Sequence, residues 1–252
     1  MNRIDLDGRV AIVTGAASGL GRAAALRFAQ SGAFVELWDI DEAALNSVAD
    51  EIGRENSSAA VVDVTRLSEI EAAAAKLASR HDHIDILLNS AGIPGLIAAR
   101  IDYPPEEWQR ILSVNLSSVF YCCRTIVPFM QRNSYGRVIN VSSMAGKNGN
   151  ADQVAYVAAK AGVIGVTKSL GKLLAGDGIL VNCIAPGIFE TPLTTAALES
   201  NPDFVHTITS QVPLGRMGHL EEFAAMASWL ASEECSFTTG FTFDLSGGRS
   251  TY

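Results

Sequence analysis

The segment Tyr-Val-Ala-Ala-Lys, which begins at Tyr156, contains two residues whose types and spacing could do chemistry. Tyr156 and Lys160 are four positions apart, so a helix would place them on one face. A phenol has a pKa of about 10 and is only about a thousandth ionised at neutral pH, but a neighbouring ammonium lowers that pKa. Ser143, thirteen residues earlier, could hydrogen-bond a reacting oxygen. These groups are suited to taking the hydroxyl proton of a secondary alcohol while hydride leaves its carbon.

A glycine-rich segment near the N-terminus could hold the group that accepts this hydride. Gly15, Gly19 and Gly21 follow an apolar run and precede a helical pattern. Glycines at a strand-to-helix turn let the backbone approach a pyrophosphate, and the helix N-terminus supplies unpaired N–H groups. Their Gly-x3-Gly-x-Gly spacing differs from the commonest dinucleotide fingerprint. Their place between a strand and a helix still predicts a dinucleotide-binding loop.

Asp39, which ends the next apolar run, predicts which dinucleotide binds. A carboxylate at this point can accept the hydroxyls of the adenosine ribose, and it would repel a 2′-phosphate. Two unit charges about 4 Å apart, in an effective dielectric of about 20, interact by about 4 kcal/mol before screening. Arg22 is the nearest base, and it could serve the diphosphate instead. The pattern therefore predicts NAD rather than NADP.

Apolar runs alternate with helical patterns along the chain. Strands are expected at 9–13, 34–38, 59–62, 84–88, 137–141, 180–184 and 241–245. Helices are expected at 19–30, 41–55, 68–80, 153–175 and 220–231, and one or two more within 106–130. Continuous apolar strands separated by helices indicate a parallel sheet that is covered on both faces. The sequence thus predicts a single-domain Rossmann-type, doubly wound α/β fold over residues 1–252. A proline-containing insertion at about 188–219 interrupts the alternation and is interpreted as a substrate loop.

Composition limits the classes of function. The formal net charge is 19 − 27 = −8, which argues against a nucleic-acid surface. No apolar stretch long enough for a membrane span and no signal peptide are recognised, so a cytoplasmic protein is expected. The four cysteines are interpreted as reduced, and the four histidines do not have the spacing of a metal site, so none is expected.

These motifs together resemble the short-chain dehydrogenase/reductase family over essentially the full length of the chain. The resemblance is carried by the loop 14–21, by Asn-Ser-Ala-Gly at 89–92, by Asn115, by Ser143, Tyr156 and Lys160, and by Pro-Gly at 186–187. It implies a seven-stranded parallel sheet, a homotetramer, and a catalytic tetrad in which Asn115 joins the other three residues. In that tetrad Asn115 would anchor a water that links Lys160 to solvent. One departure is Ser90, where the family usually has a second Asn.

The cavity is expected to combine cofactor and substrate residues. The residues predicted to bind the cofactor are Gly15, Ser18, Gly19, Leu20, Gly21, Asp39, Asp63, Val64, Asn89, Ala91, Gly92, Tyr156, Lys160, Pro186, Gly187, Ile188 and Thr191. Those predicted to touch the substrate are Ser143, Lys147, Gln153, Tyr156 and Phe189. Lys147 is a candidate to receive a substrate carboxylate, unless Glu190 cancels its charge or it is a solvated loop lysine.

The sequence therefore predicts NAD-dependent interconversion of a secondary alcohol and a ketone on a small polar compound. A sugar acid, a polyol or a hydroxy acid would fit. The chain also resembles bacterial 3-oxoacyl-acyl-carrier-protein reductases, which gives 3-oxoacyl thioester reduction as the alternative. A dinucleotide-sensing binding protein without turnover is a third possibility, and the complete Ser143, Tyr156 and Lys160 set disfavours it.

Overall fold

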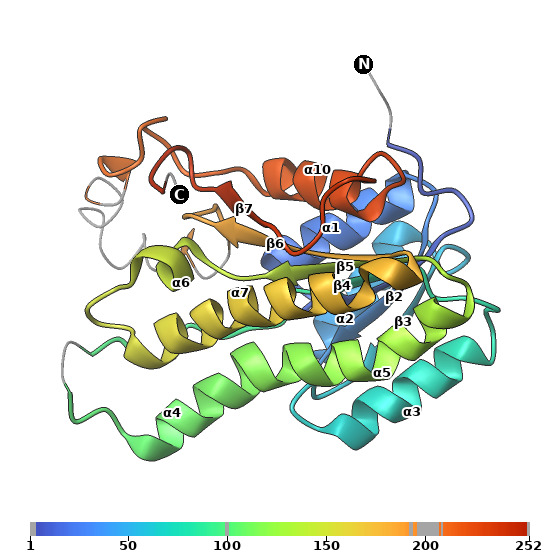
Figure 1. The fold of residues 1–252 in the computed structure, drawn as a ribbon, viewed down its shortest axis with the longest axis horizontal. Helices are drawn as coiled ribbons and strands as arrows, with labels where there is room; N and C mark the ends of the chain where they lie inside the picture. The colour runs from blue at the N-terminus through green and yellow to red at the C-terminus, as the bar shows by residue number, and fades with distance from the viewer. Residues whose placement is uncertain (1–3, 99–100, 192–193, 196–206, 208, 251–252) are drawn as a thin grey trace.

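The described strands form one parallel sheet, in the order β3-β2-β1-β4-β5-β6-β7 (Figure 1). The computed structural model describes residues 4–98, 101–191, 194–195, 207 and 209–250. The strands are β1 (Val10–Thr14), β2 (Phe34–Asp39), β3 (Ser57–Val61), β4 (Ile86–Asn89), β5 (Gly136–Val141), β6 (Ile179–Pro186) and β7 (Thr242–Leu245). This confirms the predicted Rossmann-type fold. The strand order reverses between β1 and β4, and doubly wound folds bind their ligands at such a crevice.

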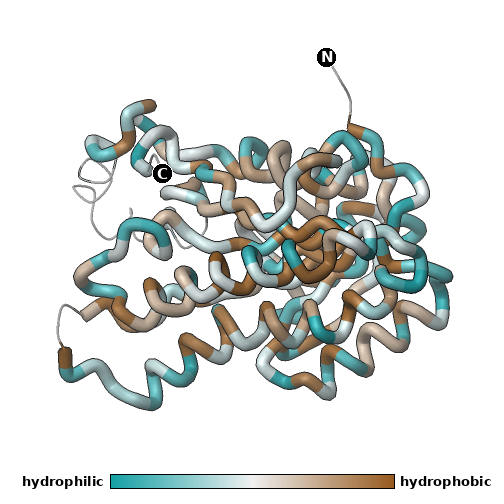
Figure 2. The backbone as a smooth tube through the Cα atoms, viewed as in Figure 1, coloured by the Kyte–Doolittle hydropathy of each residue, from teal (hydrophilic) through white to brown (hydrophobic). Residues whose placement is uncertain are grey.

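Helices cover both faces of this sheet. They are α1 (Gly19–Gln30), α2 (Glu42–Ile52), α3 (Leu67–Ala78), α4 (Pro105–Leu112), η1 (Ser113–Ser117), α5 (Ser118–Arg132), α6 (Met144–Asn148), α7 (Val154–Leu174), η2 (Ala175–Asp177) and α10 (Leu220–Ala231). One core lies under α1, α2 and α10, and the other lies under α3, α5 and α7. Hydrophobic residues accordingly concentrate in the interior, and hydrophilic residues lie mainly on the outside (Figure 2).

The alternation of side chains along β1 explains why its first four residues, 10–13, are all apolar. Ala11 and Val13 pack into the first core, whereas Val10 and Ile12 pack into the second. Successive side chains of a strand point to opposite faces, so a strand with helices on both sides needs an apolar residue at every position. All five residues of β1 are buried. This packing fixes the carboxyl end of β1, where the glycine-rich loop begins.

The helical run from α4 to α5 is interrupted by a π-helical turn, η1, that contains Asn115. Single π-helical turns inside α-helices occur frequently at functional sites. The run Pro105–Arg132 is 28 residues long and, by length and composition alone, apolar enough to span a membrane. Its buried residues, among them Val119, Cys122 and Ile126, pack into the core under α5. It is thus a core helix of the domain.

The insertion at 188–219 begins and ends at neighbouring points beside the sheet. Gly218 N donates to Ile188 O at 3.0 Å, and Glu190 N donates to Gly218 O at 3.0 Å. Within the insertion, residues 192–193, 196–206 and 208 lie outside the described residues, and these include Pro192 and Pro202. The interpretation of the insertion as a substrate loop stays a prediction.

Candidate active site

A cavity of about 1070 Å³ opens at the carboxyl ends of the strands. In Figure 1 the strand arrows point toward this edge, on the left of the view. The cavity is lined by most of the predicted cofactor residues: Gly15, Ser18, Gly19, Leu20, Gly21, Asp39, Asp63, Val64, Ala91, Gly92, Tyr156, Pro186, Gly187, Ile188 and Thr191. It is also lined by Ser143, Gln153 and Phe189. Residues that are far apart in the sequence therefore share one space, large enough for a dinucleotide and a small substrate.

Backbone atoms approach Gly15 and Gly21 of the glycine-rich loop so closely that a side chain would not fit at either position. Gly15 has a φ of +68°, and a Cβ on it would lie 2.9 Å from the Ala91 backbone. A Cβ on Gly21 would lie 2.1 Å from the carbonyl oxygen of Gly15. Helix α1 begins at Gly19, and the Ser18 side chain makes no capping hydrogen bond. The first N–H groups of α1 therefore remain to bind an anion, as the pyrophosphate of a dinucleotide requires.

Two carboxylates border the part of the cavity beside β2 and β3. Asp39 accepts hydrogen bonds from Ala17 N at 3.1 Å and from Ile40 N at 2.7 Å, which fixes its side chain beside the loop. Asp63 accepts from the Thr65 hydroxyl at 2.6 Å, and this bond holds the pKa of the Asp63 carboxyl below its ordinary value. Both positions suit groups that accept hydrogen bonds from an adenosine.

Ser143 and Tyr156 meet at the other part of the cavity. Ser143 caps α6, and its Oγ accepts from Ala145 N at 3.1 Å. Burial raises the pKa of the Tyr156 phenol above its ordinary value, while a hydrogen bond with Ser143 acts in the opposite direction. This raised value is opposite in direction to the lowered pKa that the sequence predicts for Tyr156. In the chain by itself burial dominates, so the phenol is held in its protonated form.

Lys160 lies buried behind Tyr156 rather than on the cavity wall. Its Nζ donates to Val141 O at 2.9 Å and lies 5.7 Å from the centroid of the Tyr156 ring. Burial lowers the pKa of the Lys160 ammonium from 10.5 to about 8. An ammonium this close can act on the phenol of Tyr156. With a pKa of about 8, Lys160 gains or loses its proton within the pH range in which enzymes work.

Asn115 and Lys160 both lie close to Gly92. Asn115 Oδ1 accepts from Ile93 N at 3.1 Å, and its Nδ2 donates to Ile93 O at 3.0 Å. A Cβ on Gly92 would lie 2.7 Å from Asn115 Oδ1 and 3.4 Å from Lys160 Nζ. The π-helical turn thus places Asn115 beside the ammonium, and the missing side chain of Gly92 leaves room between them.

Two predicted residues point away from the cavity. Lys147 Nζ donates to Asp244 Oδ2 at 2.8 Å, and its side chain is only 9% exposed. Its charge is therefore balanced by Asp244. Glu190, which the sequence offers as a partner for Lys147, pairs with His219. Asn89 is buried, and its Nδ2 donates to Asn140 Oδ1 at 2.9 Å. Asn89 supports the sheet under the site, because its side chain turns inward from the end of β4.

Several lining residues were missed by the sequence argument. They include Ile40, Thr65, Arg110, Ser113, Val114, Met144, Thr194 and Arg249. Most have side chains of no special chemistry, so only the folded chain identifies them. Arg110 and Arg249 are the exceptions, because each carries a positive charge in a chain of net charge −8. Among the described residues, no group of three or more His, Cys, Asp or Glu side chains could hold a metal ion.

The two pKa shifts predict the pH dependence of a reaction at this site. Alcohol oxidation needs the phenolate of Tyr156, and a raised pKa means that this form increases with pH. We expect kcat/KM for oxidation to rise from about pH 6 to about pH 9. Lys160 carries its charge only below a pKa of about 8, so Lys160→Met should lose more activity at lower pH than above this value. Initial rates of both proteins across this range measure the effect. A wild-type rate that does not change with pH would contradict it.

A Rossmann-type sheet, a dinucleotide loop and a Ser-Tyr-Lys arrangement in one cavity define a nicotinamide-dependent oxidoreductase that acts on a hydroxyl or a ketone. A family model described as enoyl-(acyl carrier protein) reductase matches residues 15–250. The chain therefore belongs to the short-chain dehydrogenase/reductase family of oxidoreductases.

Three similar proteins cover nearly the whole chain. It is 46% identical over 245 residues to a 2-dehydro-3-deoxy-L-rhamnonate dehydrogenase (NAD(+)) of Sphingomonas sp. (strain SKA58), covering 97% of this chain and 96% of the relative. It is 40% identical over 247 residues to the 3-oxoacyl-[acyl-carrier-protein] reductase of Thermotoga maritima, covering 96% and 98% of the two chains. A crystal structure of a variant actinorhodin polyketide ketoreductase with NADPH is 33% identical, with a TM-score of 0.92, covering 97% and 98%.

Proposed function

We propose that this protein is an NAD-dependent dehydrogenase that interconverts a secondary alcohol and a ketone on a small sugar acid or hydroxy acid. The observation that carries the proposal is the shared cavity. The hydrogen-bonded hydroxyls of Ser143 and Tyr156 border the same space as the glycine-rich loop and Asp39. A substrate oxygen at Tyr156 and a dinucleotide on the loop can thus lie side by side.

The mechanism assigns each role to a group already in place. When bound, the oxidised dinucleotide supplies the hydride acceptor and a positive charge beside the phenol. Ser143 donates a hydrogen bond to the substrate oxygen, and Tyr156 takes the hydroxyl proton as the C–H electron pair departs. The ammonium of Lys160 favours the phenolate form of Tyr156. In the reverse direction Tyr156 returns the proton to the oxygen of the ketone.

Asp39 supports NAD as the cofactor. A 2′-phosphate on the adenosine ribose would face this carboxylate, and the repulsion is worth about 4 kcal/mol at about 4 Å before screening. Arg22, the nearest base in the sequence, is ion-paired with Glu51 on α2. It therefore offers no uncompensated charge to a phosphate.

We expect Asp39→Asn to increase the preference for NADP. The amide keeps a hydrogen-bond acceptor for the loop and removes the negative charge. The ratio of kcat/KM with NADP to that with NAD should rise about 10- to 100-fold once screening is included. Asp41→Asn is the matched control, because Asp41 caps α2 through Ala44 N and does not line the cavity. An unchanged ratio in Asp39→Asn would remove Asp39 from this role.

The choice of substrate is tested by a panel of compounds. Sugar acids and 2-dehydro-3-deoxy sugar acids, polyols and 3-oxoacyl thioesters are assayed with both dinucleotides by nicotinamide absorbance. The proposal expects the highest kcat/KM with NAD and a sugar acid, as the activity of the Sphingomonas relative suggests. Fastest turnover of the thioester with NADPH would favour the alternative, which the Thermotoga relative represents. Dinucleotide binding with no turnover of any compound would indicate a sensing protein.

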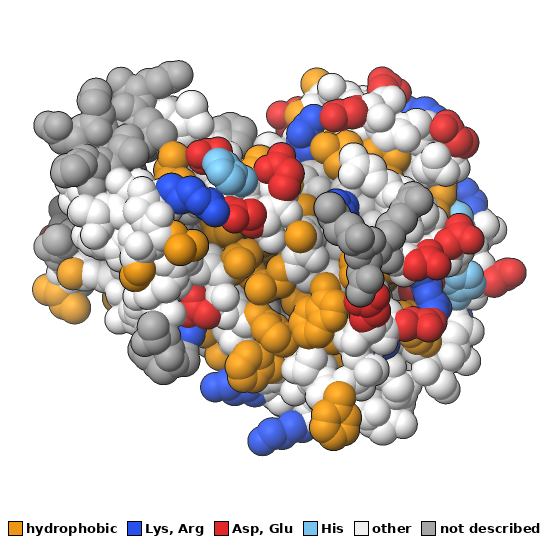
Figure 3. Space-filling view, turned by 90° about the horizontal axis from the view of Figure 1, so that it is seen from above, with side chains coloured by type: hydrophobic (Ala, Val, Ile, Leu, Met, Phe, Trp, Pro, Cys, Tyr) orange, Lys and Arg blue, Asp and Glu red, His pale blue; other side chains and the backbone are white. Residues whose placement is uncertain are grey.

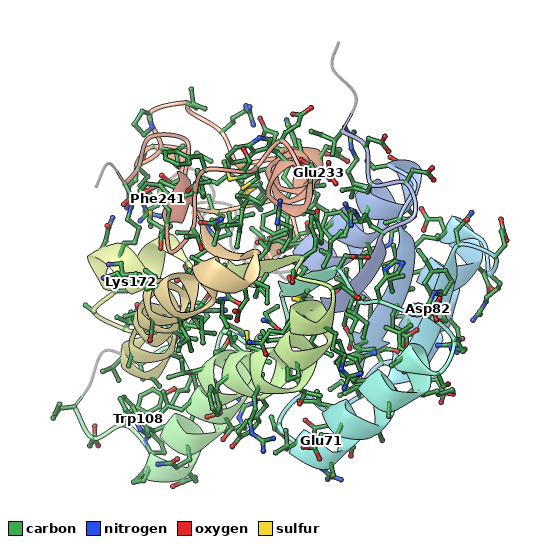
Figure 4. All side chains as sticks on the ribbon, turned by 45° about the vertical axis from the view of Figure 1, so that its right-hand side comes forward. Glu71, Asp82, Trp108, Lys172, Glu233 and Phe241 are labelled. Carbon is green, nitrogen blue, oxygen red and sulfur yellow. The ribbon has the colours of Figure 1, made fainter. Side chains whose placement is uncertain are left out.

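An exposed apolar patch supports self-association, which the proposed homotetramer requires. Phe241, just before β7, is 56% exposed, and Leu173 at the end of α7 is 70% exposed. The chain segments of these residues touch, because a Cβ on Gly171 would lie 2.4 Å from Gly240 N. Phe241 lies at the molecular surface on the same side as Lys172 (Figure 4), and apolar side chains gather in one area of the face viewed in Figure 3. Such patches mark protein interfaces.

The four cysteines support a cytoplasmic location. All four are buried and none forms a disulfide. Thiols persist in this state in a reducing compartment. We therefore propose a cytoplasmic assembly that takes a small-molecule substrate and has no nucleic-acid or membrane partner.

A further inference from the structure

Besides the buried Lys160, three basic side chains of the described residues lie around the proposed substrate region, and carboxylates balance two of them. Lys147 pairs with Asp244. Arg110 lines the cavity, and Glu107 accepts from its Nε at 2.7 Å and from its Nη2 at 2.8 Å. Neither cation is available to a substrate carboxylate without breaking an ion pair. The third cation is Arg249.

Arg249 lines the same cavity as Ser143 and Tyr156, and no carboxylate of the described residues forms an ion pair with it. Its hydrogen-bond partner among the described residues is the neutral amide oxygen of Gln211. Gln211 belongs to the insertion at 188–219, so this bond joins the C-terminal segment to the predicted substrate loop. The guanidinium has five N–H donors, and the bond to Gln211 uses one of its nitrogens.

The backbone holds Arg249 firmly in this place. Gly247 and Gly248 have φ values of +64° and +88°, which turn the chain sharply after β7. Arg249 N donates to Ser246 O at 3.3 Å, and Ser250 N donates to Ser246 Oγ at 3.0 Å. Ser250 Oγ donates to Asn148 Oδ1 at 3.0 Å, which ties the segment to α6. A cation whose backbone is fixed on both sides is preorganised for binding.

We propose that Arg249 is the residue that receives the carboxylate of the substrate and so determines the specificity of the enzyme for acids. The inference rests on the proposed function, because it names the group that selects among its substrates. Guanidinium and carboxylate match in a planar, bidentate geometry, which is stronger and more selective than a bond to a neutral group. A chain of net charge −8 repels anions at long range, so an anionic substrate needs such a local cation.

The test compares each acid substrate with its uncharged primary amide. Sugar acids and 2-dehydro-3-deoxy sugar acids that the enzyme turns over are assayed beside their primary amides, which have nearly the same shape and no charge. Arg249→Met should lower kcat/KM for the acids about 10- to 100-fold, mainly through KM, and change that of the amides less than about threefold. Arg249→Lys should recover part of the loss, because it restores the positive charge but not the planar, bidentate geometry of the guanidinium.

Arg216→Met is the matched control, because Arg216 is an exposed arginine that Glu222 already pairs with. It removes the same charge from the neighbourhood and should leave the preference for acids unchanged. Equal losses for acids and amides in Arg249→Met, or the same shift in Arg216→Met, would overturn the inference. The melting temperature and the NADH affinity of each variant are measured alongside. If the wild-type enzyme binds NADH but oxidises no alcohol, the proposed function itself is contradicted.

Discussion

Tyr156→Phe is expected to reduce kcat by about 10²- to 10⁴-fold in both directions, the usual contribution of a positioned acid or base. The substitution removes one oxygen and leaves the ring that packs beside Ile111, Ala155 and Ala159. Without that oxygen, no described group takes the substrate proton at the point where Ser143 holds the substrate oxygen. The affinity for NADH should change less than about threefold, because the glycine-rich loop and the groups near the ribose remain.

Single-turnover rates measure the chemical step, and quenching of protein fluorescence by NADH measures binding. Tyr103→Phe serves as the matched control, because the Tyr103 hydroxyl makes a long hydrogen bond, 3.4 Å, to Leu96 O. It should retain nearly all activity. A Tyr156→Phe enzyme that still turns over at more than about a tenth of the wild-type rate would contradict the assigned role.

Gly21→Ala should abolish dinucleotide binding. The new Cβ would lie 2.1 Å from the carbonyl oxygen of Gly15, a distance that neither backbone can tolerate. Either α1 or the loop must move, and the N–H groups that face the cavity move with it. We expect the Kd for NADH to rise at least about 100-fold, which corresponds to about 2.7 kcal/mol, and we expect the melting temperature to fall.

Isothermal titration with NADH and thermal unfolding monitored by circular dichroism test this expectation. Gly176→Ala is the control, because a Cβ there meets no atom within 4 Å. That variant should match or slightly exceed the wild-type stability, since alanine restricts the unfolded chain. Normal NADH affinity in a folded Gly21→Ala protein would show that the loop does not hold the dinucleotide.

The helices and strands were predictable because their signals are local. The apolar run that becomes β1 and the helical patterns that become α1 and α10 occupy nearly the predicted residues. Asp41, with which the predicted helix 41–55 begins, caps α2 by accepting from Ala44 N at 3.0 Å. The short helix α6 was missed, because five residues give too little periodicity to recognise. The π-helical turn at Asn115 was also missed, because the helical pattern of 106–130 allows one or two helices but does not mark a π-helical turn between them.

The amino-acid sequence by itself determined the fold class, the glycine-rich loop and the pairing of Tyr156 with Lys160. Each of these depends on the spacing of neighbouring residues, and the physics of strands and helices turns spacing into position. Only the tertiary structure decided which cations face the cavity. Asp244 lies 97 residues from Lys147 along the chain yet neutralises it, and Arg249 reaches the site from the far end of the sequence. Ion pairs of this kind form between residues that folding brings together, so no local sequence pattern predicts them.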